Sequence, residues 1–288
     1  MPMAARPVRT GRAVVVSALA LLLLGGAPVS QRRGQAPATD TAPASPAPAT
    51  ATATRADDAV PLVAPRVVAR FPHDRSAFTE GLLWHRGALY ESVGLEGQSE
   101  VRRVALDSGR ILARAAIPAA QFGEGLAEWH GALVSLTWHD GIARRWSIPA
   151  LHPLGTLRYA GEGWGLTSDG AALIRSDGSA TLTFHDPVTM KVRRTLAVTI
   201  RGRSLTMLNE LEWIDGRIYA NVWHTPYIVR IDPHSGRVDR VLDLSALAAE
   251  IGATDPEAVA NGIAWDATQR RLFVTGKRWP TVFEIAVP

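Results

Sequence analysis

Five positions of this sequence combine chemically capable side chains with a regular spacing. Each lies two residues before a recurring Leu or Ile, and successive copies are 44, 40, 45 and 52 residues apart. The five residues are Glu80, Glu124, Trp164, Asn209 and Asn261. Two carboxyls can move protons, two amides can bind polar groups, and an indole can form an apolar wall. This variety of types indicates a functional site, and the alternative is that the residues satisfy the backbone of turns.

A second set of five residues follows at an equally regular distance. Each lies five residues after the second apolar position of its repeat: Gly94, Trp138, Gly178, Trp223 and Lys277. Lys277 stands out because the chain has 31 Lys and Arg residues, and all except Lys191 and Lys277 are arginines. An ammonium is a compact point charge that a planar, forked guanidinium does not replace. We therefore expect Lys277 to have a specific role.

The same spacing predicts the fold. Each repeat places a second apolar residue seven to nine positions after the Leu or Ile, across a short turn such as Arg86-Gly87 or Asp215-Gly216. Such a unit is a hairpin. In most repeats a second turn, for example Asp107-Ser108-Gly109, adds another hairpin. Four strands at a period of about 45 residues are typical of a propeller blade, so the five repeats predict an all-β, five-bladed β-propeller.

The two ends of the propeller are expected to complete one blade. The fifth repeat lacks its outer strand, and residues 66–71 resemble the outer strand of the first repeat at residues 111–114. We predict that residues 66–71 pair with residues 282–285 and close the ring, which removes an exposed sheet edge. Residues 243–251 are the one helix we expect, as an insertion that explains the 52-residue spacing.

Both sets of repeated residues should meet at one place. Equivalent positions of a propeller converge on its central axis. Each inner hairpin leaves the mouth of the central channel and returns to it, so the first and second sets should line the same pocket.

Composition excludes several functions. The chain has no cysteine, which rules out a disulfide scaffold, a cysteine-ligated zinc site and a thiol nucleophile. Its net charge is +4, but residues 1–55 hold six arginines and one aspartate, a net of +5, so the remainder nets −1. A near-neutral domain lacks the basic surface that nucleic-acid binding requires, and we expect no nucleic-acid partner.

The N-terminal segment reads as a targeting signal followed by a linker. Three arginines precede a short apolar run at residues 13–27, which is typical of a secretory signal peptide. We assign residues 1–30 to the signal peptide, 31–64 to a disordered Ala/Pro/Thr-rich linker and 65–288 to the propeller domain. The alternative is an uncut membrane anchor. Cleavage predicts a periplasmic or secreted protein without a membrane contact, which we expect to be a monomer.

Six ordered motifs resemble one enzyme family, the plant- and bacterial-type glutaminyl-peptide cyclotransferases. They are residues 78–82 (FTEGL), 122–126 (FGEGL), 162–166 (EGWGL), 208–212 (LNELE), 220–223 (ANVW) and 274–280 (VTGKRWP). The resemblance covers about residues 66–288. It implies a five-bladed propeller that converts N-terminal glutamine of peptides and proteins to pyroglutamate with release of ammonia. It implies no cofactor and no metal.

The resemblance also implies roles for individual residues. Glu124 would be the catalytic acid and base, and Asn209 and Lys277 would bind and polarise the side-chain amide. The remaining expected substrate-binding residues are the pocket walls Trp138, Trp164 and Trp223, the mouth residues Phe78 and Glu80, and the ring residue Asn261. Many family members carry Gln at the position of Glu80. A second carboxyl close to Glu124 would raise a pKa by like-charge repulsion, which leaves the role of Glu80 open.

Two other functions fit part of the pattern. The oxygens of Glu80, Glu124, Asn209 and Asn261 could surround a divalent cation, as in metal-dependent propeller lactonases or esterases. Lys277 argues against this function, because an ammonium opposes a bound cation. The other alternative is a non-catalytic binding propeller.

Overall fold

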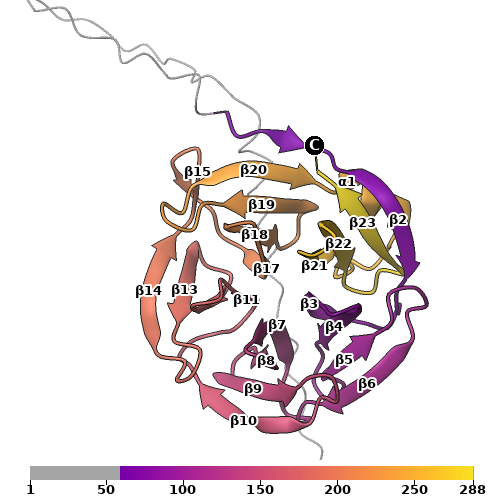
Figure 1. The fold of residues 1–288 in the computed structure, drawn as a ribbon. Helices are drawn as coiled ribbons and strands as arrows, with labels where there is room; N and C mark the ends of the chain where they lie inside the picture. Colours follow the sequence, from indigo (N-terminus) through magenta and orange to yellow (C-terminus); the bar gives the residue numbers. More distant parts are fainter. Residues whose placement is uncertain (1–58, 288) are drawn as a thin grey trace, which may run out of the picture. The chain divides into compact units, whose positions relative to one another are not determined.

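The computed structural model describes residues 59–287. Five sheets are arranged around a central axis (Figure 1). From the axis outward, blade 1 contains β3 (Thr79–His85), β4 (Ala88–Val93), β5 (Glu100–Val104) and β6 (Ile111–Ala116). Blade 2 contains β7 (Gly123–Trp129), β8 (Ala132–Thr137), β9 (Ile142–Ser147) and β10 (Pro153–Arg158). Blade 3 contains β11 (Leu166–Ser168), β12 (Leu173–Arg175), β13 (Thr181–His185) and β14 (Val192–Ala197).

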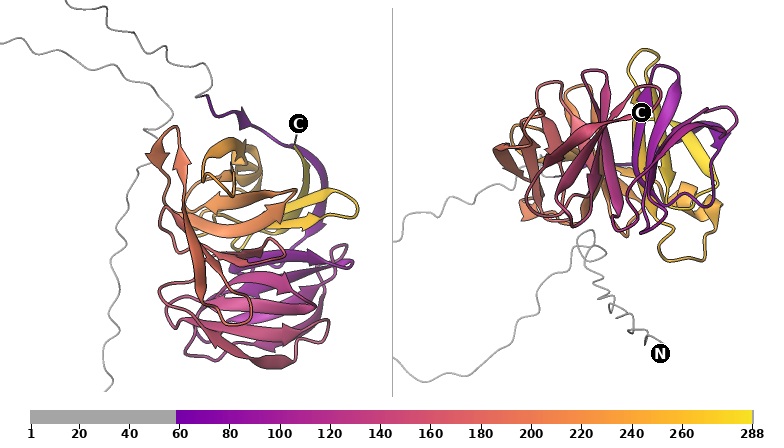
Figure 2. Two further views of the ribbon diagram at one scale, coloured as in Figure 1. Left: turned by 60° about the vertical axis from the view of Figure 1, so that its left-hand side comes forward. Right: turned by 90° about the horizontal axis from the view of Figure 1, so that it is seen from below.

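Blade 4 contains β17 (Leu208–Ile214), β18 (Arg217–Val222), β19 (Tyr227–Ile231) and β20 (Val238–Asp243). Blade 5 contains β21 (Ala260–Asp266), β22 (Arg271–Gly276), β23 (Thr281–Ala286) and β2 (Arg66–Pro72). A small hairpin of β15 (Thr199–Ile200) and β16 (Arg203–Ser204) lies outside the blades. The five-bladed propeller predicted from the repeats is therefore confirmed. In the further views, strands cross the thickness of the ring and loops project from its two faces (Figure 2).

The ring closes as the sequence predicts. β2 pairs antiparallel with β23, with Phe71 opposite Val282 and Arg70 opposite Phe283. The outer strand of blade 5 thus comes from the start of the domain and its other three strands from the end. The expected helix is present as α1 (Ser245–Ile251), between blades 4 and 5. Within residues 59–287, no helix is long and apolar enough to cross a bilayer.

The N-terminal boundary of the propeller differs from the expected one. We expected the linker to reach residue 64, but β1 (Leu62–Val63) pairs in parallel with β20 and adds a fifth strand to blade 4. The last residues of the expected linker therefore belong to the sheet, since two apolar residues suffice to pair with an open strand edge. The predicted signal peptide and residues 31–58 of the linker lie outside the described residues.

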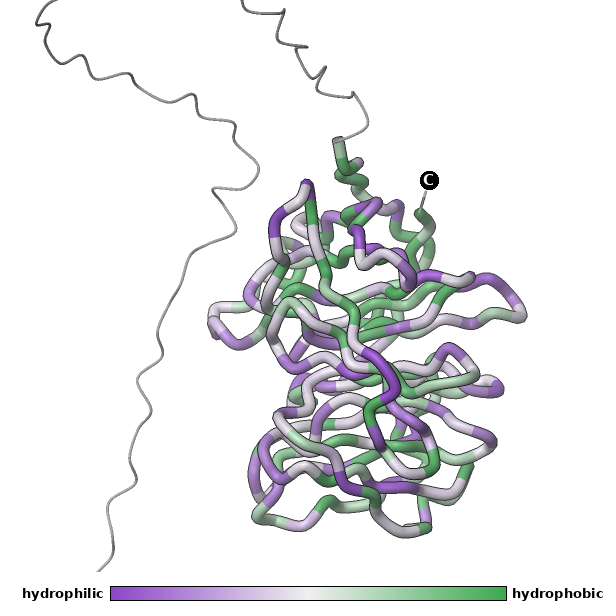
Figure 3. Tube along the Cα trace, turned by 90° about the vertical axis from the view of Figure 1, so that its left-hand side faces the viewer, coloured by the Kyte–Doolittle hydropathy of each residue, from purple (hydrophilic) through white to green (hydrophobic). Residues whose placement is uncertain are grey.

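Turn chemistry explains the inner hairpins. β3 and β4 are joined by two residues, Arg86 and Gly87, which both have positive φ (46° and 87°). His130-Gly131 and Asp215-Gly216 repeat this geometry. Two positive φ angles in a two-residue loop define the type I′ turn, whose twist matches that of paired strands. Figure 3 shows hydrophilic and hydrophobic positions interspersed along the chain of the propeller, as expected for strands with two different environments.

Inner strands of neighbouring blades approach one another at the backbone level. A Cβ on Gly125 of β7 would lie 2.5 Å from the amide nitrogen of Leu166 in β11, so a glycine is required here. Blade 4 carries Glu210 at the equivalent position. Its buried carboxyl accepts hydrogen bonds from the backbone N–H groups of Leu82 (3.2 Å) and Ile263 (2.9 Å), in blades 1 and 5. One side chain thus links three blades across the axis.

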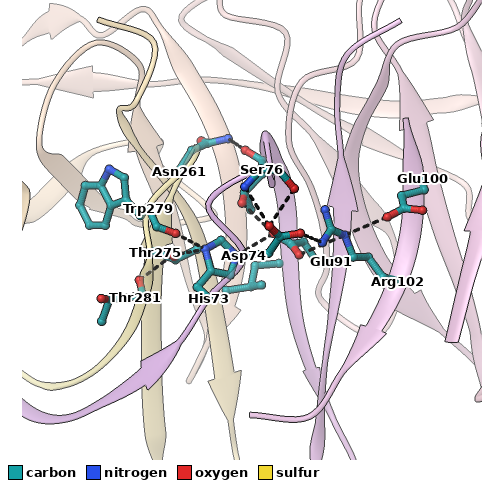
Figure 4. Close-up of polar contacts among 12 residues, drawn as sticks. His73, Asp74, Ser76, Glu91, Glu100, Arg102, Asn261, Thr275, Trp279 and Thr281 are labelled. Atoms are coloured by element: carbon teal, nitrogen blue, oxygen red, sulfur yellow. Dashed lines mark hydrogen bonds and ion pairs between the residues drawn. The ribbon is translucent and has the colours of Figure 1, made fainter. Parts of the chain in front are cut away.

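A buried polar network joins blades 5 and 1 at the ring closure (Figure 4). His73 lies in the loop after β2. Its Nε2 is 2.9 Å from Oε1 of Glu91, and its Nδ1 is 2.6 Å from the carbonyl oxygen of Trp279. A carbonyl and a carboxylate both accept, so this geometry suits a doubly protonated ring. Thr79 and Arg102 also contact the Glu91 carboxylate, at 2.7 and 3.6 Å.

The charges of this network favour its ionised form. Burial alone would lower the pKa of His73, but the charge and hydrogen bond of Glu91 and the carbonyl of Trp279 reverse this and raise it. Burial would raise the pKa of Glu91, but His73, Arg102 and Thr79 lower it. The raised His73 pKa contributes stability below the unfolded value of about 6.5, and that stability is lost as pH rises through the folded pKa. The lowered Glu91 pKa contributes stability that is lost only in acid.

We therefore expect His73→Gln to destabilise the propeller most at mildly acidic pH. Breaking a buried ion pair costs about 3–5 kcal/mol, and the remaining contacts of Glu91 favour the lower end. Melting curves of both proteins between pH 5.5 and 9, values chosen to bracket about 6.5, provide the measurement. The Tm difference should shrink as pH rises. A difference that is independent of pH would show that the pair carries no proton-linked stability.

Candidate active site

A cavity of about 250 Å³ opens at one end of the central channel. Its lining residues are Phe78, Glu80, Leu95, Phe122, Glu124, Trp138, Trp164, Asn209, Trp223, Glu257 and Lys277. These include all the site residues expected from the sequence except Asn261. Both repeated sets contribute, because β3, β7 and β17 begin at this mouth and the strands paired with them end there. From the second set, Trp138, Trp223 and Lys277 line the cavity, as expected, and the other two members are glycines.

Asn261 lies behind the cavity wall and not on it. The residue is fully buried, and its Nδ2 donates to the carbonyl oxygen of Thr79 (2.9 Å) and to Oε2 of Glu80 (3.3 Å). The Asn261 side chain, which extends from β21, therefore supports Glu80 instead of facing the cavity.

Glu80 and Lys277 form a buried ion pair. Nζ of Lys277 lies 2.7 Å from Oε1 of Glu80, and the two side chains are 6% and 2% exposed. The ammonium also lies 4.4 Å from the ring centroid of Phe78 and 5.9 Å from that of Trp223, in the geometry of cation–π contacts. Burial, opposed by Lys277 and reinforced by Glu257, raises the pKa of Glu80 to about 7.

Glu124 faces the same cavity without a partner. Its side chain is buried, and its carboxyl makes no hydrogen bond or ion pair within residues 59–287. Burial raises the pKa of Glu124 well above its usual range, the charges of Glu80 and Glu162 raise it further, and Lys277 opposes them. A carboxyl with a raised pKa and free oxygens is a candidate for accepting and donating a proton in catalysis.

Two further polar atoms in the wall are unpaired. Oδ1 of Asn209 and Nε1 of Trp223 are buried and have no hydrogen-bond partner among the described residues. One is an acceptor and the other a donor. An unpaired buried polar group is costly unless a ligand satisfies it. A carboxamide, which offers both N–H donors and a carbonyl acceptor, complements this pair.

Five aromatic side chains form a collar around the cavity, here named the aromatic collar: Phe78, Phe122, Trp138, Trp164 and Trp223. The Phe78 and Phe122 ring centroids are 6.2 Å apart, and those of Phe122 and Trp138 are 5.6 Å apart. Trp164 and Trp223 meet edge to face at 5.3 Å. Such contacts leave an apolar space that excludes water around the polar groups.

Three lining residues were not expected as site residues: Leu95, Phe122 and Glu257. The repeat contained a signal for Phe122, because it lies two residues before Glu124 as Phe78 lies two before Glu80. Leu95 directly follows a member of the second set. Glu257 comes from the insertion before β21, which has no equivalent in other repeats, so no sequence pattern pointed to it.

The two glycines of the second set leave room for the collar. A Cβ on Gly178 would lie 2.6 Å from the Trp164 ring, and a Cβ on Gly94 would overlap the Phe122 ring and lie 3.0 Å from Cγ of Glu80. In the second set, the two tryptophans and the lysine supply groups to the cavity wall, and the two glycines leave space for the aromatic rings of the wall.

The geometry bears on the metal-site alternative. Glu80 is paired with Lys277, and Asn261 donates to Glu80 from behind the wall. Within residues 59–287, no three His, Cys, Asp or Glu side chains are grouped in a way that could hold a metal ion. Of the four residues proposed for a cation, Glu80 is thus paired with an ammonium and Asn261 lies behind the wall, which leaves Glu124 and Asn209 as the unpaired oxygen-bearing residues of the cavity.

Gly94→Ala should test the fit of the collar. The added methyl group must displace Phe122 or Glu80, and overpacking of this kind costs about 1–3 kcal/mol. We expect a lower Tm together with weaker binding of any ligand that occupies the cavity. Gly87→Ala provides a contrast, because a Cβ there meets no atom within 4 Å, although its positive φ makes that substitution strained in its own way. Unchanged ligand binding in the Gly94 variant would contradict the fit described here.

Comparison with known proteins agrees with the fold and identifies the family. The family model described as glutamine cyclotransferase matches residues 41–287. A glutaminyl-peptide cyclotransferase of Arabidopsis thaliana is 40% identical over 223 residues, which are 76% of this chain and 70% of that protein. The crystal structure of Myxococcus xanthus glutaminyl cyclase superposes with a TM-score of 0.75 at 39% identity, over 78% of this chain and 97% of that one. The chain therefore belongs to the glutamine cyclotransferase family.

Proposed function

We propose that this protein is a glutaminyl-peptide cyclotransferase, which converts the N-terminal glutamine of peptides and proteins to pyroglutamate with release of ammonia. The observation that carries the proposal is the placing of an unpaired, high-pKa carboxyl, Glu124, in one cavity with an unpaired acceptor on Asn209 and an unpaired donor on Trp223. Family membership and the 40% identity with the Arabidopsis enzyme support it.

The cavity suits one terminal residue. Its volume of about 250 Å³ is below the range of roughly 300–1,000 Å³ that is usual for small-molecule sites. A glutamine side chain and its α-amine can enter, while the rest of the peptide must extend from the mouth. Acidic Glu257 at the cavity and the carboxyl of Glu124 favour an incoming N-terminal ammonium.

The reaction moves one proton between two nitrogens of the same residue. The α-nitrogen attacks the side-chain carboxamide carbon, a C–N bond forms, and the bond to the leaving nitrogen breaks. The α-nitrogen must lose a proton, and the leaving nitrogen must gain one to depart as ammonia. Glu124 can take the first proton and return it to the leaving group, because burial and the neighbouring carboxylates raise its pKa and so help it to hold the proton between the two transfers.

The developing charge on the carboxamide oxygen requires fixed donors. The Lys277 ammonium, held by Glu80, has N–H groups left to donate, and the indole N–H of Trp223 is unpaired. Oδ1 of Asn209 can accept from the carboxamide or the amine. Donors that are fixed before the reaction stabilise the transition state without reorganisation, and the apolar collar strengthens them by excluding water.

The alternatives receive less support. The two comparisons with named enzymes favour a cyclotransferase over a metal-dependent lactonase or esterase and over a non-catalytic binding propeller. We further propose that the enzyme acts as a monomer on peptide substrates and does not bind nucleic acid, since residues 56–288 net −1.

We expect Glu124→Gln to abolish turnover while the fold remains intact. Gln has nearly the same shape, so proton transfer is lost and packing is kept, and a general acid–base group contributes ~10²–10⁴-fold. Ammonia release from a Gln-initiated dipeptide amide is the assay, with a melting curve on the same sample.

Glu80→Gln is the matched carboxyl variant. It should lose less activity than Glu124→Gln, because the amide oxygen of Gln can still accept from Lys277, and its acidic limb of kcat/KM should move to lower pH, because the charge that raises the Glu124 pKa is removed. If Glu80→Gln were inactive and Glu124→Gln near normal, the proton carrier would be Glu80. A wild-type protein that releases no ammonia would refute the proposed function.

We also propose that the protein is exported, to the periplasm or outside the cell, with its signal peptide removed. The basic and apolar pattern of residues 1–30 supports this. Intact mass of the protein recovered from the periplasm or medium should correspond to a chain that starts at about residue 27–35, because small residues end the apolar run there. A mass that includes Met1 would favour an uncut anchor.

A further inference from the structure

One carboxylate at the mouth of the cavity contacts two walls at once. Oε2 of Glu162 accepts a hydrogen bond from Nε1 of Trp138 and another from Nε1 of Trp164, both at 2.9 Å. Trp138 follows β8 in blade 2, and Trp164 precedes β11 in blade 3. A single oxygen atom therefore joins indoles that belong to different blades.

This junction lies where the aromatic collar is divided. The ring contacts run from Phe78 through Phe122 to Trp138 on one side and from Trp164 to Trp223 on the other. Glu162 joins the two parts at the Trp138–Trp164 boundary. At the opposite boundary, the Lys277 ammonium lies over both Phe78 and Trp223. Two charged groups thus complete a wall that aromatic contacts alone leave in two pieces.

The segment that carries Glu162 is itself held in place. The Arg175 side chain is 5% exposed, and its guanidinium donates to the carbonyl oxygens of Glu162 and Ala160. The N–H of Gly163 donates to the carbonyl oxygen of Trp138 at 3.0 Å. These hydrogen bonds hold the backbone at Glu162, so its carboxylate extends from a fixed position.

Of the two tryptophans, Trp138 is the more exposed and depends more on its hydrogen bond to Glu162. It is 36% exposed, and its ring stacks on the more exposed His139, with centroids 3.8 Å apart; Nδ1 of His139 lies 3.5 Å from Oε1 of Glu162, so this histidine also faces the carboxylate. An exposed indole without a hydrogen bond can change rotamer at little cost. The Glu162 side chain is 43% exposed, so water competes for the carboxylate, and the expected effect is moderate.

We propose that Glu162 is a positioning residue for the cyclisation: it holds Trp138 and Trp164 on one oxygen and so fixes the aromatic collar around the terminal glutamine. This proposal rests on the proposed function. The reaction needs the α-nitrogen and the carboxamide carbon in near-attack contact, and a loosened wall lets the side chain extend away from the amine.

The Glu162 charge has a second, separable effect. The groups that act on the Glu124 carboxyl are Glu80, Glu162 and Lys277, and Glu257 lines the same cavity. Tyr159, buried beneath, is in turn affected by the Glu124 charge. Without the negative charge of Glu162, the pKa of Glu124 falls, and the acidic limb of the kcat/KM profile moves to lower pH. The hydrogen bonds and the charge can therefore be tested independently.

Two substitutions separate these effects. Glu162→Ala removes the hydrogen bonds and the charge, while Glu162→Gln removes the charge but keeps an oxygen that can accept from the indoles. Glu96→Gln is the control, since Glu96 is an exposed acid next to the cavity-lining Leu95 and contacts no tryptophan within the described residues. The measurements are KM, kcat and the pH profile of ammonia release from a Gln-initiated dipeptide amide, the Tm, and the near-UV circular dichroism of the indoles.

We expect Glu162→Ala to raise KM and to lower kcat/KM by about tenfold. The near-UV dichroism should change, and the Tm should stay nearly the same. Glu162→Gln should keep KM close to wild type, and both variants should shift the acidic limb to lower pH. Glu96→Gln should match wild type in every measurement. A purely structural role for Glu162 would lower Tm and the active fraction, and hence apparent kcat, without changing KM.

The proposal is overturned if Glu162→Ala has the wild-type KM, or if Glu162→Gln raises KM as much as Glu162→Ala does. If Glu162→Ala does not fold, Glu162→Leu takes its place, because it keeps the side-chain bulk but offers the indoles no acceptor: a raised KM supports the proposal, and the wild-type KM overturns it. Absence of ammonia release by wild-type protein would instead refute the proposed function and this proposal with it.

Discussion

The close approach of the inner strands around the axis is the constraint on which the site depends. Backbone meets backbone where Gly125 of β7 faces Leu166 of β11, so the residues next to such glycines are held at fixed positions around the mouth. Blade 4 replaces the glycine with Glu210, whose carboxyl accepts from blades 1 and 5. A substitution that adds a side chain at Gly125 would separate the blades and move Glu124 with them.

Burial at this mouth raises the pKa of both first-set carboxyls, and their partners then distinguish them. Glu80 has Lys277 at 2.7 Å and Asn261 behind it, whereas Glu124 has neither. A buried ammonium needs an anion to offset its desolvation, and Glu80 supplies it. The pair is therefore a fixed electrostatic unit, and the proposed mechanism assigns the proton-carrying role to Glu124. The open role of Glu80 is thus best explained as support for Lys277.

Repetition made much of this structure predictable. Equivalent residues of repeats converge by symmetry, so blade number, closure by residues 66–71 and seven of the expected cavity residues could be located from spacing alone, whereas Phe78 came from the family resemblance. Features without a repeat equivalent could not. Glu257 lies in an insertion, and β1 adds a strand that no other blade has. The His73–Glu91 contact depends on which side chains meet where the chain ends join, which spacing does not encode.

The geometry around Lys277 explains why a lysine stands at this position in a chain that otherwise uses mostly arginine. Its ammonium lies between the faces of Phe78 and Trp223 and against one oxygen of Glu80, a space bounded on three sides. A guanidinium is planar and directs its N–H groups in a fork, which matches two parallel acceptors better than a single oxygen between two rings. An arginine here would leave N–H groups pointing at ring faces or would push Phe78 outward. The same compactness that lets Lys277 lie between two rings of the aromatic collar leaves it N–H groups beyond the one that Glu80 accepts. In the proposed mechanism one of these donates to the substrate carbonyl, so one residue is both part of the wall and the electrophilic donor.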